Sequence, residues 1–274
     1  MEQARTAVAT AGPGETLNSV LRAIQWALDR MVSVGYGVVY DYIAARFQPY
    51  RDLRAEVVQL LESSVPPEGN RRDVRVLDVA CGPGHFTTVL AEAGFDTVGV
   101  DAYDALVELA REKRRARHLS NLSFRQADLT RGNVFRDESF DRVVNIHSLY
   151  VHADPQRLLS EAFRILKPGG QAVFVNFTRR VHLVEAFRDV HRREGLAAAL
   201  GCLLWVLPNA VFEGMRKRTG PHYWDDREFR ARLEQAGFEV RELRRTFFGG
   251  VSLLAWVAKP GLPADETPLQ EADG

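Results

Sequence analysis

The nonapeptide Val76-Leu77-Asp78-Val79-Ala80-Cys81-Gly82-Pro83-Gly84 runs from a short apolar stretch into a Gly-x-Gly turn. A helical pattern follows from about Phe86, so this segment is typical of the first strand, tight turn and helix start of a nucleotide-binding α/β unit. Gly82 and Gly84 can adopt backbone angles that other residues avoid, and without side chains they let a ligand lie against the main chain. Open α/β sheets bind ligands in the crevice outside the carboxyl end of such a strand.

The turn narrows the choice of ligand. A dinucleotide-binding fingerprint would have a third glycine where Thr87 stands, and no Gly-Lys-Ser/Thr of a phosphate-binding loop follows. The nonapeptide resembles the first motif of the class I S-adenosylmethionine-dependent methyltransferases, and the resemblance extends over about residues 36–259. It implies a Rossmann-like methyltransferase fold, S-adenosylmethionine as cofactor and a small-molecule acceptor. The alternative, an ordinary strand-to-helix turn without a ligand, stays open at this point.

Strand and helix patterns alternate regularly after the nonapeptide. This alternation predicts an α/β fold with a doubly wound, mostly parallel sheet of seven strands. The last two strands are joined through Gly249-Gly250 with no helix between them, which predicts an antiparallel hairpin at one sheet edge. The predicted strands are 74–79, 97–100, 122–126, 140–146, 171–177, 238–243 and 251–258, and the predicted helices are 53–61, 87–93, 106–117, 155–166 and 226–236.

Changes in residue type along the chain indicate the expected domain boundaries. Residues 71–259 are expected to form the S-adenosylmethionine-binding domain, with a helical lid insert at 178–223. Apolar residues at helical spacing in 15–70 predict an N-terminal helical cap. Small and polar residues at 1–14, and an acidic, Pro-rich tail at 260–274, predict disordered ends.

The overall charge and the cysteine content exclude several classes of protein. The 274 residues have a formal net charge of zero and 46% are hydrophobic, which is typical of a soluble globular protein without a field that attracts nucleic acid. Cys81 and Cys202 lie in no Cys-x-x-Cys or Cys/His cluster, so neither a disulfide framework nor a metal site is expected. The first 15 residues lack the pattern of a signal peptide, and we expect a cytoplasmic protein.

Asp101 ends the second predicted strand, 19 residues after Gly82. A carboxylate at this point can accept two hydrogen bonds from a ribose diol, although a solvated acid that caps the next helix is the plainer alternative. Ala102 follows it in the expected cofactor site. A sulfonium cation suits the acidic and aromatic surroundings that these strands and the N-terminal segment would supply.

The resemblance implies further cofactor contacts. The matching family positions assign the adenine amino group to Asp128 and the packing on the adenine ring to Leu129, while a surface turn is the alternative for Asp128. Asn145, at the end of the fourth strand, is where the family holds the methionine portion. Asp78, followed by Ala80 in the turn, is expected to fix that turn or to meet the ammonium group.

Candidates for catalysis and acceptor binding are less well defined. His147 follows the fourth strand closest to the crevice and is the candidate general base, with a structural, hydrogen-bonded histidine as the alternative. Tyr36 and Tyr40 either roof the site or pack a helix onto the sheet. His222 is a candidate acceptor contact, but it also precedes an ordinary helix start at Asp225. The candidate acceptor-binding residues are Tyr36, Tyr40, Tyr150, Trp205 and His222.

The segment Gly195–Phe212 contains no charged residue and is flanked by basic residues on both sides. Gly201 and Pro208 argue against one continuous membrane span. Three interpretations stay open: a lid over an apolar substrate, a homodimer contact, or a peripheral contact with a membrane interface. Each favours a lipophilic acceptor such as an isoprenoid, quinone, polyketide or lipid.

The sequence therefore predicts an S-adenosylmethionine-dependent enzyme that methylates a small lipophilic acceptor by direct displacement. One alternative is a cyclase or isomerase that keeps the cofactor as a structural or electrostatic element, and another is a non-catalytic binding module. Nucleic-acid methylation is not expected, because the fourth strand continues as Asn145-Ile146-His147-Ser148 and not as Asn/Asp-Pro-Pro-aromatic.

Overall fold

The structure is a computed structural model of the chain. It describes Asp41 and residues 44–132, 134–178, 183–203, 206–207 and 222–261. Several expectations lie outside this part of the chain: the lead at 1–14, nearly all of 15–43, much of the insert, and the tail from 262. The candidate acceptor-binding residues that lie outside it are Tyr36, Tyr40 and Trp205.

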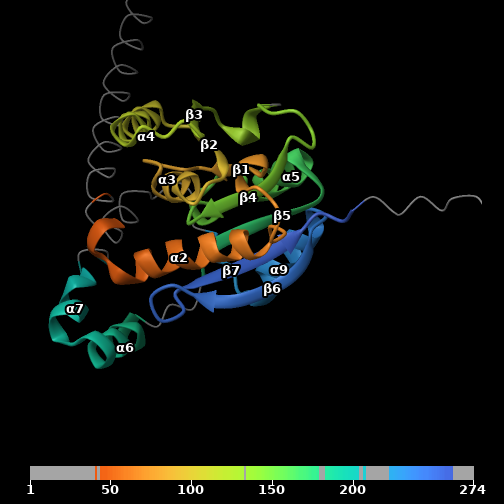
Figure 1. The fold of residues 1–274 in the computed structure, drawn as a ribbon. Coiled ribbons are helices and arrows are strands. Elements are labelled where there is room, and N and C mark those ends of the chain that lie inside the picture. The colour runs from red at the N-terminus through yellow and green to blue at the C-terminus, as the bar shows by residue number, and fades with distance from the viewer. Residues whose placement is uncertain are drawn as a thin grey trace, which may run out of the picture.

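Seven strands form one mixed sheet, as predicted (Figure 1). The strand order is β3-β2-β1-β4-β5-β7-β6, and all neighbours up to β5 are parallel, whereas β7 pairs antiparallel with both β5 and β6. The hairpin at the sheet edge is thereby confirmed. The strands are β1 (Arg75–Val79), β2 (Asp96–Asp101), β3 (Leu122–Gln126), β4 (Phe140–Ile146), β5 (Leu166–Phe177), β6 (Glu239–Thr246) and β7 (Ser252–Ala258).

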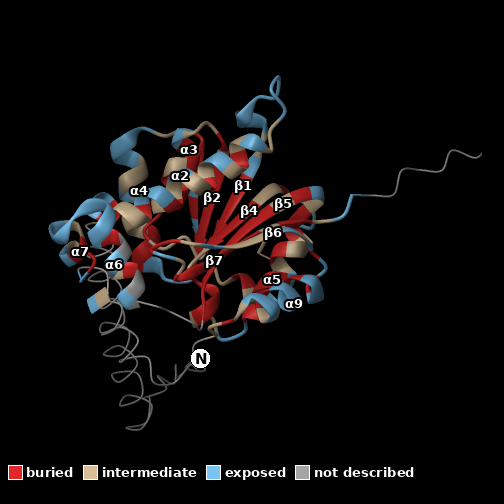
Figure 2. Cartoon of the chain, turned by 90° about the horizontal axis from the view of Figure 1, so that it is seen from below, coloured by how far each residue is buried: buried red, intermediate tan, exposed pale blue. Residues whose placement is uncertain are grey.

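Helices cover both faces of the sheet. Figure 2 shows the buried strands between α2, α3 and α4 on one side and α5 and α9 on the other. In β1, Val76 joins the cluster beneath α2 and α3, while Leu77 and Val79 join the cluster beneath α5 and α9, so the strand is buried on both faces. The helices are α2 (Gln48–Ser63), α3 (His85–Glu92), α4 (Asp104–Arg117), α5 (Pro155–Ile165), α6 (Leu183–Glu194), α7 (Leu196–Gly201) and α9 (Asp226–Gln235), with short 3₁₀ turns η1 (Arg71–Asp73), η2 (Leu129–Arg131) and η3 (Leu149–Val151).

Local chemistry fixes several element ends. Asp154 caps α5 by accepting a hydrogen bond of 3.0 Å from the backbone N–H of Arg157, and Asp225 and Glu228 form a capping box at α9. Several predicted element ends differ from the structure, and two of the predicted starts differ most. The helix α2 begins at Gln48 and not at residue 53, because Pro49 is favourable in a first turn. The strand β5 begins at Leu166, since the Pro-Gly-Gly segment after the helix continues within the strand.

The order in which successive strands are added to the sheet reverses between β1 and β4. β1 pairs with β2 on one side and β4 on the other, so the connections that leave these two strands diverge. A crevice outside the carboxyl ends at such a switch point is where doubly wound sheets bind ligands. The nonapeptide ends at this point. No helix among the described residues is long and apolar enough to cross a membrane.

Candidate cofactor site

The turn after β1 is built from left-handed residues. Ala80, Gly82 and Gly84 have φ angles of 55°, 54° and 79°. A Cβ added at Gly82 would meet nothing within 4 Å, so this residue faces open space. A Cβ at Gly84 would lie 2.7 Å from the ring of Phe124. Gly84 therefore admits a neighbouring ring, whereas Gly82 leaves room for a ligand to approach the backbone.

Asp101 at the end of β2 reaches across to this turn. One carboxylate oxygen accepts a hydrogen bond of 2.8 Å from the N–H of Gly82, and the other accepts one of 2.9 Å from the N–H of Tyr103. Burial raises the pKa of this carboxyl, although both backbone bonds favour its ionised form. A carboxylate oxygen can accept a second hydrogen bond, so room for a ribose diol remains. Ala102 beside it is exposed.

Asp78 lies within β1, almost fully buried. The hydroxyl of Thr87 donates a hydrogen bond of 2.6 Å to it. Burial raises the pKa of Asp78 to about 7, and the nearby carboxylate of Asp101 acts in the same direction. A cation such as an ammonium group would favour its ionised form. The contact with Thr87 also ties β1 to the first turn of α3.

Asn145 bridges β4 and β1 across the switch point. Its amide nitrogen donates hydrogen bonds of 2.8 Å to the carbonyl of Val79 and 2.5 Å to the hydroxyl of Ser148. Its side-chain oxygen is buried and has no hydrogen-bond partner among the residues that the structure describes. Unpaired buried acceptors are rare and costly, so this oxygen is available to a donor of a bound ligand.

Asp128 caps the turn η2. Its carboxylate accepts hydrogen bonds from the backbone N–H of Thr130 at 3.0 Å and from the hydroxyl of Thr130 at 2.6 Å, and pairs with Arg131 at 2.9 Å. Burial raises its pKa, but the bonds from Thr130 outweigh this effect and keep the pKa below its usual value. Leu129 is buried in the core cluster that also contains Val79 and Val100. The adenine contacts assigned to these two residues stay predictions.

A contact that sequence reasoning missed joins the N-terminal segment to the turn. Asp41 pairs with His85 Nε2 at 2.8 Å and with Lys113, which also donates a hydrogen bond of 3.0 Å to the carbonyl of Pro83. Burial raises the pKa of Asp41, but the bonds from His85 and Lys113 lower it by more. The spacing of these residues in sequence is too long for a local pattern to predict the pairing.

His147 is packed tightly. Its ring stacks on Phe177 with centroids 4.1 Å apart, and its Nε2 lies 2.8 Å from the hydroxyl of Ser252. The other ring nitrogen, Nδ1, is buried and finds no partner in the described part of the chain. Burial lowers the pKa of His147 to about 3, far below the range that suits a general base. Its catalytic role stays a prediction, and these surroundings favour the structural alternative.

Aromatic rings line the ends of β4 and β5. Tyr150 is buried, packs edge-on against Phe177 at 4.8 Å and stacks on Tyr223 at 5.6 Å. His222 lies next to them, since its N–H donates a hydrogen bond of 2.7 Å to the carbonyl of Tyr150. The structure thus brings Tyr150 and His222 together, as expected for one site, although it does not test their contact with an acceptor.

A strained turn completes this region and was not predicted. Four successive residues of the β6–β7 turn, Phe247–Gly250, have positive φ angles. Such angles are outliers for aromatic residues. The ring of Phe247 lies 4.9 Å from that of His147, and a Cβ added at Gly249 would lie 2.9 Å from Ala186 of α6. Ring burial and contact with α6 hold the turn in this conformation, and strain of this kind gathers at functional sites.

The residues at the switch point fit a nucleoside that carries an amino acid. Gly82 leaves an open approach to the backbone, Asn145 offers an unpaired buried oxygen, and Asp78 and Asp101 place two carboxylates beside the turn. Among the described residues, no group of His, Cys, Asp and Glu could hold a metal ion. The fold and the site define an α/β enzyme of the nucleoside-binding, doubly wound class.

The comparisons give the family. The sequence model of a protein family described as "Methyltransferase domain" matches residues 42–243, so the chain belongs to this methyltransferase family. The protein is an S-adenosylmethionine-dependent methyltransferase, and its cofactor is S-adenosylmethionine. The demethylmenaquinone methyltransferase of Tropheryma whipplei strain Twist is 32% identical over 179 residues, which cover 65% of this chain and 72% of that protein.

Solved structures share the fold. One chain of the complex between the Haloferax volcanii Trm112 methyltransferase activator and a methyltransferase matches with a TM-score of 0.56 and 21% identity, covering 82% of this chain and 97% of that one. The [4+2]-cyclase SpnF matches with a TM-score of 0.55 and 19% identity, covering 76% and 81%. At this identity the likeness concerns the fold alone.

Proposed function

We propose that this methyltransferase acts on a small lipophilic acceptor of the quinol type. The observation that carries the proposal is the apolar wall at the ends of β4 and β5, formed by the buried rings of Phe47, Tyr150, Phe177, Phe247 and Phe248. A hydrophilic acceptor would have to give up water against these rings without gaining hydrogen bonds, at a net cost. The similarity to a demethylmenaquinone methyltransferase supports the same class.

The chain's own residues would bind and align the reactants. Asp101 and the turn at Gly82 would hold the nucleoside, while Asn145 and Asp78 would orient the amino acid portion. When bound, S-adenosylmethionine supplies an electrophilic methyl group. Alignment of two reactants contributes a large part of the acceleration of such a displacement. The proton that the acceptor loses would pass to water, because burial lowers the pKa of His147 to about 3 and makes it a poor base.

The experiment incubates the protein with methyl-labelled S-adenosylmethionine and a reduced 1,4-naphthoquinone that lacks the methyl group. We expect label in the quinone fraction and an equal amount of S-adenosylhomocysteine. Label that remains in S-adenosylmethionine, with the protein shown to bind S-adenosylhomocysteine by calorimetry, would contradict the proposal. The same calorimetric titration without heat would instead favour a non-catalytic module without cofactor affinity.

A cyclase or isomerase is the second candidate. It is supported by the shared fold of the cyclase SpnF, and the lowered pKa of His147 is compatible with it as well as with methyl transfer. This alternative predicts an acceptor that rearranges while S-adenosylmethionine stays intact. Product mass separates the two, because methyl transfer adds one methyl group and rearrangement adds none.

The outer face of the insert supports a peripheral contact with a membrane. Residues 178–223 contain eight Lys and Arg against four Asp and Glu, although the whole chain is neutral. Apolar side chains spaced like the face of a helix, flanked by cations, suit an anionic lipid surface. Five of the six large apolar side chains that are exposed among the described residues lie on this segment: Val184, Leu196, Leu200, Leu203 and Leu207.

Vesicle sedimentation tests the membrane contact. We expect the protein to sediment with phosphatidylglycerol vesicles, and the double variant Leu196→Ser/Leu200→Ser to stay in the supernatant. A dimer that is seen by light scattering and that the double variant dissociates would contradict this proposal and identify a second copy as the partner.

A cytoplasmic location, expected from unpaired Cys81 and Cys202, stays a prediction.

A further inference from the structure

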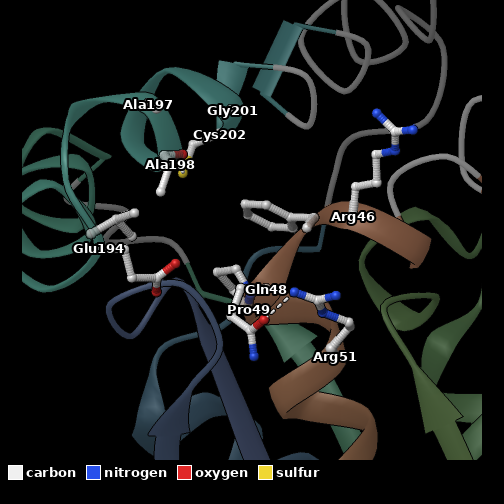
Figure 3. A pocket seen from close by; sticks show the side chains of 11 residues that line it. Arg46, Gln48, Pro49, Arg51, Glu194, Ala197, Ala198, Gly201 and Cys202 are labelled. Carbon is white, nitrogen blue, oxygen red and sulfur yellow. Dashed lines mark hydrogen bonds between the residues drawn. The ribbon is translucent and has the colours of Figure 1, made fainter.

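A hollow of about 260 Å³ lies between the start of α2 and the helices α6 and α7. Figure 3 shows Gln48 and Pro49 of α2 on one side and Ala197, Ala198 and Gly201 of α7 on the other, and Phe47 also lines the hollow. The hollow is separate from the turn at Gly82, and none of the cofactor residues lines it. Nothing in the cofactor site accounts for its presence.

The inner lining of the hollow is mostly apolar. It includes Phe47, Pro49, Val190, Ala198 and Cys202, while the charged groups of Arg46, Arg51 and Glu194 belong to exposed residues. An apolar ligand portion would exchange water for these side chains, and each buried methylene adds to binding. A hollow with this lining suits a hydrocarbon chain better than a polar ring.

Aromatic contacts connect the hollow to the end of β4. Phe47 packs edge-on against Phe247 at 5.9 Å and against Phe248 at 5.5 Å. Phe247 in turn contacts His147, which directly follows β4. These buried rings pack side by side between the hollow and the end of β4, so a molecule with its chain in the hollow and its ring at the end of β4 would contact the same aromatic cluster at both ends.

Small residues of α7 keep the hollow open. Ala197, Ala198 and Gly201 line it from the α7 side. A Cβ added at Gly201 would meet nothing within 4 Å, and the φ angle of this glycine is not positive, so a side chain there is accommodated without strain. Leu200, the neighbouring residue, is exposed on the outer face and does not line the hollow.

We propose that this hollow binds the hydrocarbon chain of the acceptor, and that Gly201 determines how long a chain it takes. The inference rests on the proposed lipophilic acceptor and assigns the place of its chain. A larger residue at position 201 would fill the space that the chain needs. The ring of the acceptor and the cofactor would bind as before, because none of the cofactor residues lines the hollow.

The test compares Gly201→Leu with the matched control Leu200→Phe. Gly201→Leu fills the hollow and improves helix propensity, so we expect an unchanged or higher melting temperature. Leu200→Phe adds bulk to the same helix on its outer face. Binding of two probes is measured by calorimetry: unsubstituted 1,4-naphthoquinone, and the same ring with a decyl chain.

In the wild-type protein the decyl chain should tighten binding by roughly tenfold or more, since several methylenes are buried. Gly201→Leu should lose most of this gain, whereas Leu200→Phe should retain it, and both variants should bind S-adenosylhomocysteine like the wild type. An equal chain effect in all three proteins, or no chain effect in the wild type, would overturn the assignment.

Failure of the proposed function has a different signature. Binding of the decyl probe that depends on Gly201, together with no methyl transfer to any reduced naphthoquinone, would reject the acceptor class and keep the hollow as a chain-binding site. Methyl transfer whose KM depends on chain length equally in the wild type and Gly201→Leu would keep the function and reject the hollow.

Discussion

The carboxylate of Asp101 accepts a hydrogen bond of 2.8 Å from the backbone N–H of Gly82, so the acid that ends β2 holds the turn that follows β1. We expect Asp101→Ala to weaken the binding of S-adenosylhomocysteine by about 1–3 kcal/mol, because bonds to a charged acceptor are lost. Calorimetry measures this loss. The control is Asp96→Ala at the opposite end of β2, where the carboxylate only pairs with exposed Arg75 at 3.8 Å.

Unchanged affinity in a folded Asp101→Ala protein would remove the ribose assignment. The bond to Gly82 adds a second consequence, since its N–H loses its acceptor when the side chain is truncated. We therefore expect the variant to melt at a lower temperature than the wild type, while Asp96→Ala melts close to it.

The two glycines of the turn should respond differently to alanine. Both require left-handed backbone angles, which cost other residues about 1–2 kcal/mol. Gly84→Ala also places a methyl group 2.7 Å from Phe124, and overpacking adds about 1–3 kcal/mol. We expect Gly84→Ala to lose more stability in urea unfolding, and Gly82→Ala to lose more affinity for S-adenosylhomocysteine. Equal effects on affinity would argue that Gly82 does not face the ligand.

The sequence could predict that the residues of the candidate cofactor site lie together because they are close in the chain, while their contacts with the cofactor stay predictions. Asp78, Gly82 and Gly84 lie in one nonapeptide, and Asp101 ends the next strand, so spacing alone brings them to one edge of a parallel sheet. The sheet itself follows from the alternation of strand and helix patterns, and only element ends such as the start of α2 at Gln48 were wrong.

The features that sequence reasoning missed depend on contacts between distant residues. The pairing of Asp41 with His85 and Lys113 joins three segments, and no periodic pattern indicates it. The left-handed angles of Phe247 and Phe248 run against the preference of aromatic residues, so propensity predicts the opposite conformation. Packing against Ala186 and Phe47 overrides that preference, and such packing is visible only in three dimensions.

His147 gives a direct test of whether the enzyme uses a base at the end of β4. Its pKa of about 3 keeps the imidazole neutral and weakly basic at physiological pH. We expect His147→Gln to retain most of kcat and to lose about 1 kcal/mol of stability with the bond to Ser252. Ser252→Ala removes the same bond and should match it. A fall in kcat of roughly a hundredfold or more in His147→Gln alone would restore the catalytic role.

Asp78 should make both stability and cofactor affinity depend on pH. Its pKa is about 7 in the folded protein, raised by burial, against an ordinary value near 3.8. Below about pH 4 the carboxyl is protonated in both states, and its contribution to the free energy of unfolding is complete. As the pH rises from about 4 through about 7, the carboxyl ionises more easily in the unfolded chain than in the folded protein, so this contribution is lost. The loss is at most about 4 kcal/mol. Asp78→Asn should abolish this decline in urea unfolding, whereas Asp96→Asn, at a half-buried position of β2, should keep it.

A bound ammonium group favours the ionised form of Asp78, whereas burial in the free protein favours the protonated form. The affinity for S-adenosylhomocysteine should therefore rise between about pH 5 and pH 8, as Asp78 ionises. The rise should be absent in Asp78→Asn, and calorimetry at several pH values measures it. Burial also raises the pKa of Asp101, and Asp101→Asn therefore serves as the comparison. A rise that disappears in Asp101→Asn but persists in Asp78→Asn would place the titrating carboxylate at the ribose and leave Asp78 the role of fixing the turn through Thr87.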